Sequence, residues 1–196
     1  MSSFSKYYRG FEKMQEFIIN DLKNATIKGH ANFLVAMALF NYIEILGSFY
    51  YPCDIKEKEI KRFNFVFTNL LPAEYNKVFK DIRDRIAKPY SLLRCGMTHA
   101  YIPVTLPVKN QNIDISYSIK GVNNIEEYNQ CIKNIQCGIE LINNNKNEYL
   151  INVYNPRLIH DFNTAFEELK KKINSEDYYK AKFIIRASDI NLDRLS

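Results

Sequence analysis

The apolar stretch "FLVAMALF", residues 33 to 40, constrains the fold of this chain more than any other segment. It belongs to a segment from Ala31 to Leu46 that is apolar almost all round, so a helix formed there would have no side suited to water. The run is shorter than the roughly 20 apolar residues needed to span a bilayer. We therefore expect a central, buried helix of a helical bundle, ended by Gly47.

Apolar residues recur at spacings of three and four on both sides of this helix, which predicts further amphipathic helices. The three stripes are Tyr7, Phe11, Met14, Ile18 and Leu22; Tyr75, Val78, Phe79, Ile82 and Ile86; and Leu158, Phe162, Phe166, Leu169 and Ile173. Additional helices are expected from Ile55 to Leu71, from Tyr90 to about Ala100, and over "EDYYKAKFIIRAS" near the C-terminus.

The pattern changes after Pro103. Residues 113 to 119 alternate between apolar and polar, which predicts a strand. Residues 137–142 and 149–154 flank the turn-like "NNNKN" and predict a hairpin, whereas residues 125–135 are ambiguous. The predicted fold is mainly α: a helical bundle with a small antiparallel β-sheet inserted before the C-terminal helices. We expect one domain, with the bundle over 5–103, the insertion over 104–155 and the last helices over 156–196.

The composition is that of an ordinary globular chain. The 196 residues are 46% hydrophobic and 25% charged, enough for one domain with a sizeable core. A net charge of +5 permits binding to a polyanion, but a basic protein with a mixed-charge surface explains it equally well. The four cysteines form no CxxC pair, and the first fifteen residues contain no signal-like apolar run. We expect reduced cysteines in a cytoplasmic protein that does not enter the membrane.

Common catalytic motifs are absent from the sequence: there is no GxxxxGK[ST], GxGxxG, HExxH or GxSxG. With histidines only at positions 30, 99 and 160, we expect neither a metal site nor a cofactor. Arg94 and His99, within "YSLLRCGMTHAYIP", remain as candidates. An arginine can bind a phosphate through two donors, and a histidine can exchange a proton near neutral pH. Phosphodiester cleavage without a metal requires both abilities.

The same pair has an ordinary structural interpretation. Arg94 would pair with a carboxylate such as Glu44, and His99 would cap the C-terminus of its helix, where a cation is favourable. Five residues correspond to about 140° of helix rotation, so the side chains diverge from one axis. They would line one cleft only if a neighbouring helix or a second subunit closed over this end.

The segment "RCGMTH", residues 94 to 99, in a late helix of a helical half, resembles the R-x4-6-H signature of the HEPN superfamily (higher eukaryotes and prokaryotes nucleotide-binding). The apolar helix from Ala31 to Leu46, with Glu44 embedded in it, also resembles the central helix of such domains. The resemblance covers roughly residues 5 to 103 and does not extend to the hairpin region.

The resemblance implies a helical bundle that forms a homodimer, with two such motifs meeting in a composite cleft. Many members are metal-independent endoribonucleases of defence or toxin–antitoxin systems, so RNA and an antitoxin or nucleotidyltransferase are the implied partners. On this chain, His99 would assist attack of the ribose 2′-OH and Arg94 would hold the scissile phosphate. The product would carry a cyclic phosphate. Glu44 and Tyr101 are the predicted substrate-binding residues; Tyr101 would stack on a base, with core packing as its alternative.

One position departs from the pattern of active members, which usually carry Asn, Asp or His directly after the arginine, where this chain has Cys95. The superfamily also contains non-catalytic binding and scaffold domains. Three functions therefore follow from the sequence: a ribonuclease, a non-catalytic module that binds a nucleotide or a protein, and an accessory protein of a phage or mobile element without a small-molecule site.

Overall fold

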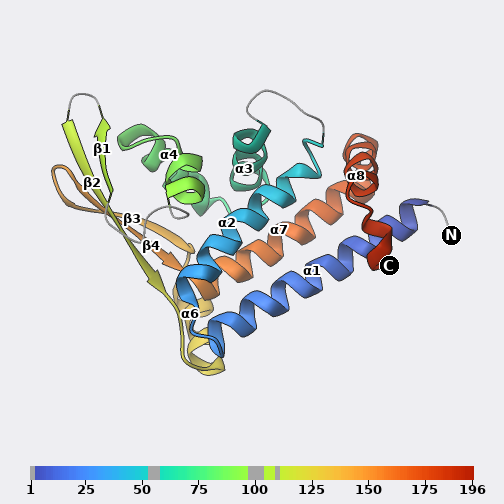
Figure 1. Ribbon diagram of the computed structural model, residues 1–196, viewed down its shortest axis with the longest axis horizontal. Coiled ribbons are helices and arrows are strands. Elements are labelled where there is room, and N and C mark those ends of the chain that lie inside the picture. The colour runs from blue at the N-terminus through green and yellow to red at the C-terminus, as the bar shows by residue number, and fades with distance from the viewer. Residues whose placement is uncertain (1–2, 53–57, 97–103, 109–110) are drawn as a thin grey trace.

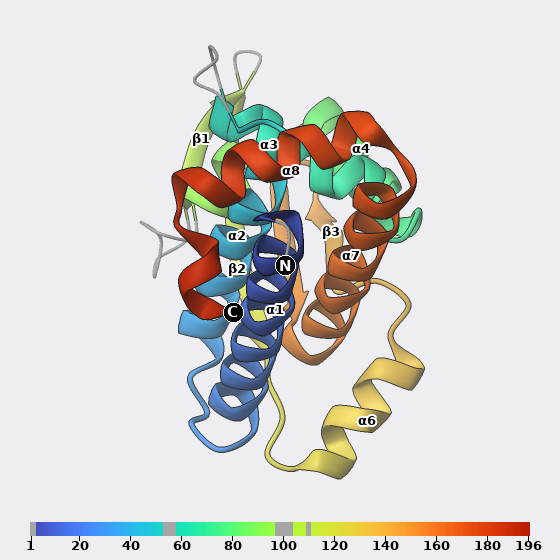
Figure 2. The ribbon, with the colours of Figure 1, turned by 90° about the vertical axis from the view of Figure 1, so that its right-hand side faces the viewer.

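The computed structural model describes residues 3–52, 58–96, 104–108 and 111–196. Three long helices lie side by side at its centre: α1 (Ser3–Ile27), α2 (Asn32–Ser48) and α7 (Asn155–Ser175) (Figure 1). Two shorter helices, α3 (Lys58–Asn69) and α4 (Glu74–Arg85), follow α2. The last helix, α8 (Asp177–Asp189), crosses one end of the long helices, and a short 3-10 helix, η2 (Leu192–Leu195), returns along α1 (Figure 2). No helix in the described part is long and apolar enough to cross a membrane.

The helix α2 is the centre of the bundle, as the sequence predicts. It contacts α1, α3 and α7, and its residues Leu39, Phe40 and Ile43 are completely buried. Phenylalanines from four helical segments meet beside it: the ring of Phe11 lies 4.8 Å from that of Phe49, 5.2 Å from Phe166 and 5.4 Å from Phe183. Because Phe166 and Phe183 belong to α7 and α8, the C-terminal helices form part of the same core as the N-terminal ones.

The prediction that Gly47 ends α2 is wrong, because the helix continues to Ser48. Gly47 is buried against α3, and a Cβ atom at this position would clash with the backbone carbonyl group of Arg62. The glycine therefore allows α3 to approach α2 closely, which is a packing role rather than a helix-ending one.

The predicted amphipathic stripes face the core. On α7 the whole stripe is at most 1% exposed: Leu158, Phe162, Phe166, Leu169 and Ile173. On α1, Phe11, Ile18 and Leu22 are buried, while Tyr7 and Met14 at the edge are half-buried. On and just after α4, Tyr75, Phe79, Ile82 and Ile86 are buried and Val78 is half-buried. The helical periodicity of the sequence thus identifies the core faces correctly.

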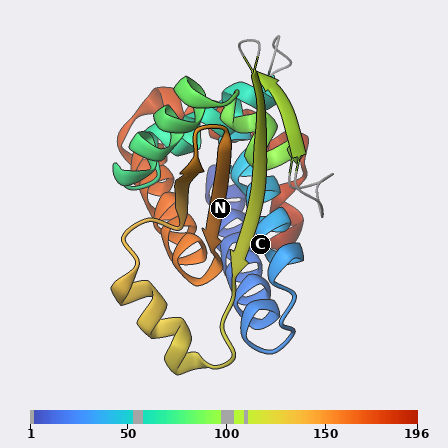
Figure 3. The same cartoon turned by 90° about the vertical axis from the view of Figure 1, so that its left-hand side faces the viewer.

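The small sheet lies at the other side of the bundle (Figure 3). Its strands are β1 (Val104–Val108), β2 (Gln111–Lys120), β3 (Ile139–Asn145) and β4 (Glu148–Tyr154), in the spatial order β1-β2-β4-β3. The predicted strand over 113–119 and the predicted hairpin are both present. The pairs β1/β2 and β3/β4 are antiparallel, but β2 and β4 run parallel, so the sheet is mixed rather than purely antiparallel.

The parallel pair has a physical cause in burial. The strand β4 carries the completely buried Ile151 and Val153, whereas β3 ends in the polar run Asn143 to Asn145. Placing β4 in the middle and β3 at the edge buries the more apolar strand. The connection from β2 to β3 contains α6 (Ile125–Asn134) and begins and ends at the same end of the sheet. From there β3 runs antiparallel to β2, and β4 returns parallel to β2 between the two strands.

The segment that the sequence left ambiguous is the helix α6. Two side chain–backbone hydrogen bonds cap its N-terminus. The side chain of Asn124 accepts a hydrogen bond from the N–H of Glu127 (2.9 Å), and the Glu127 carboxylate accepts one from the N–H of Asn123 (2.9 Å). This arrangement resembles a capping box, except that the Glu127 carboxylate accepts from the residue before the N-cap Asn124.

Candidate functional site

Arg94 lies on a turn of π-helix, Tyr90–Gly96, that follows α4. Its residues Leu92 and Leu93 are buried, and they attach the turn to the core between α2 and α3. A π-helix forms i→i+5 hydrogen bonds and is rare, and it occurs frequently at functional sites. The sequence predicts an ordinary helix here from Tyr90 to about Ala100; the part of it beyond Gly96 lies outside the described residues.

The strand β2 holds this turn through Tyr117. The Tyr117 hydroxyl donates a hydrogen bond to the backbone carbonyl of Leu92 (3.0 Å). Gly96 lies directly against the same hydroxyl, since a Cβ atom at Gly96 would be only 2.7 Å from the Tyr117 oxygen. A side chain at position 96 would therefore push the Tyr117 hydroxyl away from its hydrogen bond with Leu92.

Glu44 is the group on which the site is built. It is the only charged residue of α2, and its Oε2 atom lies 3.4 Å from Nε of Arg94. The hydroxyl of Tyr90 donates to the same Oε2 at 3.3 Å. The side chains of Arg94 and Glu44 are 24% and 20% exposed, so the ion pair is partly removed from water yet still reachable from the surface.

The two tyrosines of the site remain hydrogen-bond donors at any physiological pH. Burial, together with the negative charge of Glu44, raises the pKa of Tyr90 to about 12. Burial alone raises the pKa of Tyr117 to about 12. Neither phenol can therefore act as a proton acceptor near neutral pH, and their role is to orient Glu44 and the π-helical turn.

The structure brings two of the four predicted site residues together. Arg94 and Glu44 form the ion pair that the sequence offered as the structural interpretation of Arg94. His99 and Tyr101 lie outside the described residues. Cys95, between the two motif residues, is half-buried.

No family model matches the chain, and no curated protein and no solved structure is significantly similar to it. The resemblance to HEPN domains accordingly rests on the residues of the motif and of the apolar helix, and it stays a prediction.

Sequence reasoning missed Tyr90 and Tyr117 as parts of the site. Tyr90 precedes Arg94 by four residues, a spacing that places two side chains on one helical face, so this signal was available. Tyr117 could not be found in this way, because its contact with Leu92 joins segments 25 residues apart.

A second polar cluster, in which Tyr75 and Asp161 are buried and Arg157 is partly exposed, joins α4, α7 and the start of β3. The Tyr75 hydroxyl donates to Oδ2 of Asp161 (2.7 Å) and accepts a hydrogen bond from the N–H of Gly138 (2.8 Å). Arg157 Nε donates to the same Asp161 oxygen (2.8 Å). Burial raises the pKa of Tyr75 well above its usual value, with the Asp161 charge adding to the effect. The partners satisfy one another, so this cluster fixes the position of β3.

Metal chemistry has no support in the described part of the chain, where no group of three or more His, Cys, Asp or Glu side chains is arranged to hold a metal ion. His160 is exposed on α7. It thus offers a histidine outside the Arg94 site that can serve as a control.

Proposed function

We propose that this protein is an RNA-directed, HEPN-like protein that cleaves RNA without a metal ion, using Arg94 and His99. The observation that carries the proposal is the placement of Arg94: a π-helical turn presents it, and Glu44 holds its Nε. An arginine oriented in advance by a carboxylate has less side-chain entropy to lose when it binds a phosphate.

In the proposed reaction, His99 accepts the proton of the ribose 2′-OH as its oxygen attacks the adjacent phosphorus. The bond from phosphorus to the 5′ oxygen breaks, leaving a 2′,3′-cyclic phosphate and a 5′-hydroxyl end, which takes up a proton. Arg94 stabilises the negative charge that accumulates on the non-bridging oxygens of the phosphate. Glu44 positions the guanidinium and does not itself contact the reacting atoms.

A second candidate is a non-catalytic HEPN-like module that binds a nucleotide or a protein. It is favoured by the ion pair itself, because Glu44 neutralises part of the Arg94 charge that would otherwise stabilise the phosphate during cleavage. Cys95 after the arginine points in the same direction. Such a module would bind RNA or a nucleotide in a salt-dependent way, since phosphate contacts release counterions, but it would leave the RNA intact.

The two candidates separate in a cleavage assay with labelled single-stranded RNA in the presence of EDTA. The enzyme predicts cleavage that is lost in His99→Ala and Arg94→Ala and retained in His160→Ala, the exposed control. Mass spectrometry of the fragments should show cyclic phosphate ends. Cleavage that persists in folded His99→Ala protein would exclude the proposed mechanism, and binding without cleavage by the native chain would establish the second candidate.

The proposal includes a homodimer, because the resemblance places two motifs in one composite cleft. Sedimentation velocity on the same samples measures this directly. A native chain that cleaves RNA while it sediments as a monomer would show that one Arg94 site suffices and that the composite cleft does not apply here.

A further inference from the structure

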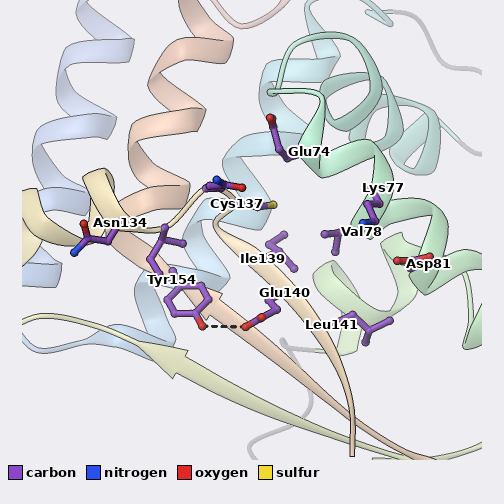
Figure 4. A pocket seen from close by; sticks show the side chains of 12 residues that line it. Glu74, Lys77, Val78, Asp81, Asn134, Cys137, Ile139, Glu140, Leu141 and Tyr154 are labelled. Carbon is purple, nitrogen blue, oxygen red and sulfur yellow. Dashed lines mark hydrogen bonds between the residues drawn. The ribbon is translucent and has the colours of Figure 1, made fainter.

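A groove of about 570 Å³ runs between α4 and the edge strand β3, away from Arg94 (Figure 4). One wall is α4, with Lys77, Val78 and Asp81. The other is β3, with Ile139 and Leu141. The Tyr75–Asp161 cluster fixes the start of β3 through the N–H of Gly138, so the two walls keep a defined position relative to each other.

The backbone of β3 is open toward this groove. The strand pairs only with β4, and the N–H of Tyr154 donates to the carbonyl of Gly138 (2.9 Å), which makes these two residues a hydrogen-bonded pair. Antiparallel ladders alternate, so the backbone groups of Ile139 and Leu141 point away from β4. The Ile139 N–H donates to the sulfur of Cys137. On this side the backbone groups of Leu141 have no backbone partner among the described residues.

The side chains around this edge alternate in character. Ile139 and Leu141 point to the α4 side of β3, with Ile139 beside Val78, whereas Glu140 points to the opposite face, toward Tyr154 (Figure 4). Glu140 is held there because its Oε2 accepts hydrogen bonds from the Tyr154 hydroxyl (3.0 Å) and from Nδ2 of Asn152 (3.0 Å). An added strand would therefore place alternate apolar residues toward Val78 and polar residues beside Glu140.

The charges that line the groove favour a basic occupant. The groove is lined by three residues with carboxylates, Glu74, Asp81 and Glu140, and by one with an ammonium group, Lys77. Asp81 also lies 3.9 Å from Nη2 of Arg85. A second copy of this chain fits less well, because antiparallel pairing of two β3 strands about a two-fold axis at Glu140 would bring two Glu140 carboxylates together.

We propose that this groove binds an extended, basic peptide segment of a partner protein, which adds as a strand to the open edge of β3. Main-chain hydrogen bonds to Leu141 and to the Ile139 carbonyl provide affinity. Apolar side chains facing Val78 and basic side chains facing the acidic rim provide selectivity. The site is separate from Arg94 and does not depend on RNA cleavage.

The first test titrates the full chain into a fluorescein-labelled Lys-Val-Lys-Val-Lys peptide and follows fluorescence polarisation. We expect saturable binding that weakens as NaCl is added, and no binding of Glu-Val-Glu-Val-Glu. N-methylation of alternate peptide amides should abolish binding for one alternating set and spare the other, because only one set faces β3. Equal effects of the two sets, or equal binding of the acidic peptide, would overturn the proposal.

Two pairs of variants test the groove itself. Leu141→Pro removes an outward N–H without taking a bond from the β3/β4 ladder, so we expect binding about tenfold weaker than in Leu141→Ala, which keeps the N–H. Asp81→Lys should weaken binding, whereas Asp84→Lys, the same charge change outside the groove on the same helix, should not.

The outcomes of these variants are decisive in both directions. Unchanged affinity in folded Leu141→Pro protein, or equal effects of the two lysine variants, would contradict strand addition in this groove. A native dimer that Leu141→Pro converts to monomers would identify a second copy as the occupant instead. If Leu141→Pro does not fold, the N-methylated peptides still decide the question on the native chain.

Discussion

Glu44 is an unusual residue for its position, since it places a carboxylate in a helix that is otherwise apolar on nearly every side. Two neighbours compensate the cost of partial burial: the Nε of Arg94 at 3.4 Å and the hydroxyl of Tyr90 at 3.3 Å. A partly buried charge that loses one partner leaves the other uncompensated. The motif arginine therefore contributes to stability as well as to the proposed chemistry, and the two contributions can be measured separately.

Replacing Glu44 by Gln should lower the free energy of unfolding by about 1–2 kcal/mol, because Arg94 then lies beside a neutral group. The variant Arg94→Met should have a loss of similar size. Urea denaturation of both single variants and the double variant gives the coupling energy, which we expect to be about 0.5–1.5 kcal/mol. Asp84→Asn, at a pair whose two side chains are about half exposed, is the control and should leave the midpoint unchanged. Additive effects of the two substitutions would show that the pair contributes nothing.

At the scale of secondary-structure elements, the contact between α2 and α3 depends on one glycine. A Cβ atom at Gly47 would clash with the carbonyl group of Arg62, whose side chain is itself buried and donates to the carbonyl oxygens of Tyr51 (2.8 Å) and Pro52 (3.2 Å). The helix α2, the residues Tyr51 and Pro52 that follow it, and the helix α3 are thus tightly connected. The helix α3 cannot move away without breaking those hydrogen bonds.

Gly47→Ala should therefore destabilise the protein by about 1–3 kcal/mol, the usual cost of overpacking a core. The sign of the change in unfolding free energy is informative, because Gly→Ala inside an unhindered helix stabilises the protein by about 0.5–1 kcal/mol. Thermal or urea unfolding followed by circular dichroism measures it, with the exposed Ser188→Ala on α8 as a control that should have little effect. A Gly47→Ala protein as stable as the native one would mean that α2 and α3 separate easily.

The elements also show where sequence patterns stop being informative. The stripes on α1, α4 and α7 could be predicted because residues three and four apart share a helical face. The π-helical turn at Tyr90–Gly96 could not, because it is fixed by Tyr117 of β2 and by the space that Gly96 leaves for it. The pairing of β2 with β4 was also beyond reach, since it depends on which strand gains more by burial.

At the scale of the whole molecule, the abundance of tyrosine has a consequence for pH. Burial is the main cause of a raised pKa at six tyrosine side chains: Tyr50, Tyr75, Tyr90, Tyr117, Tyr128 and Tyr154. In the unfolded chain a tyrosine titrates near pH 10. A group whose pKa is higher in the folded state contributes its full stability below its unfolded pKa. This contribution is lost as the pH rises from the unfolded pKa through the folded pKa.

We therefore expect the free energy of unfolding to begin falling near pH 9, because burial also raises the pKa of the Cys131 and Cys137 thiols, and to fall more steeply between pH 10 and 12 as the tyrosines titrate. Tyr117, with a pKa of about 12, should account for a loss of about 1 kcal/mol by pH 11. Urea midpoints measured across this range test the expectation, and Tyr117→Phe should have a shallower fall than the native chain. Stability that stays constant up to pH 12 would contradict the burial of these phenols.

The sequence by itself determined most of the helical framework, the positions of β2, β3 and β4 and the presence of one Arg-x4-His motif, because residues close together in the chain specify each of these. The strand β1 and the helix α6 were not predicted. Tertiary structure alone decided that Tyr117 holds the Arg94 turn, that β4 lies between β2 and β3, and that α4 faces an open strand edge. The hydrogen bonds behind these features join residues 25 to 63 positions apart, and their energies come from packing and desolvation between segments. Local periodicity carries little information about such pairings. The sequence named Glu44 as a carboxylate for Arg94, but it did not indicate the contact of Tyr117 or which strand lies beside β2.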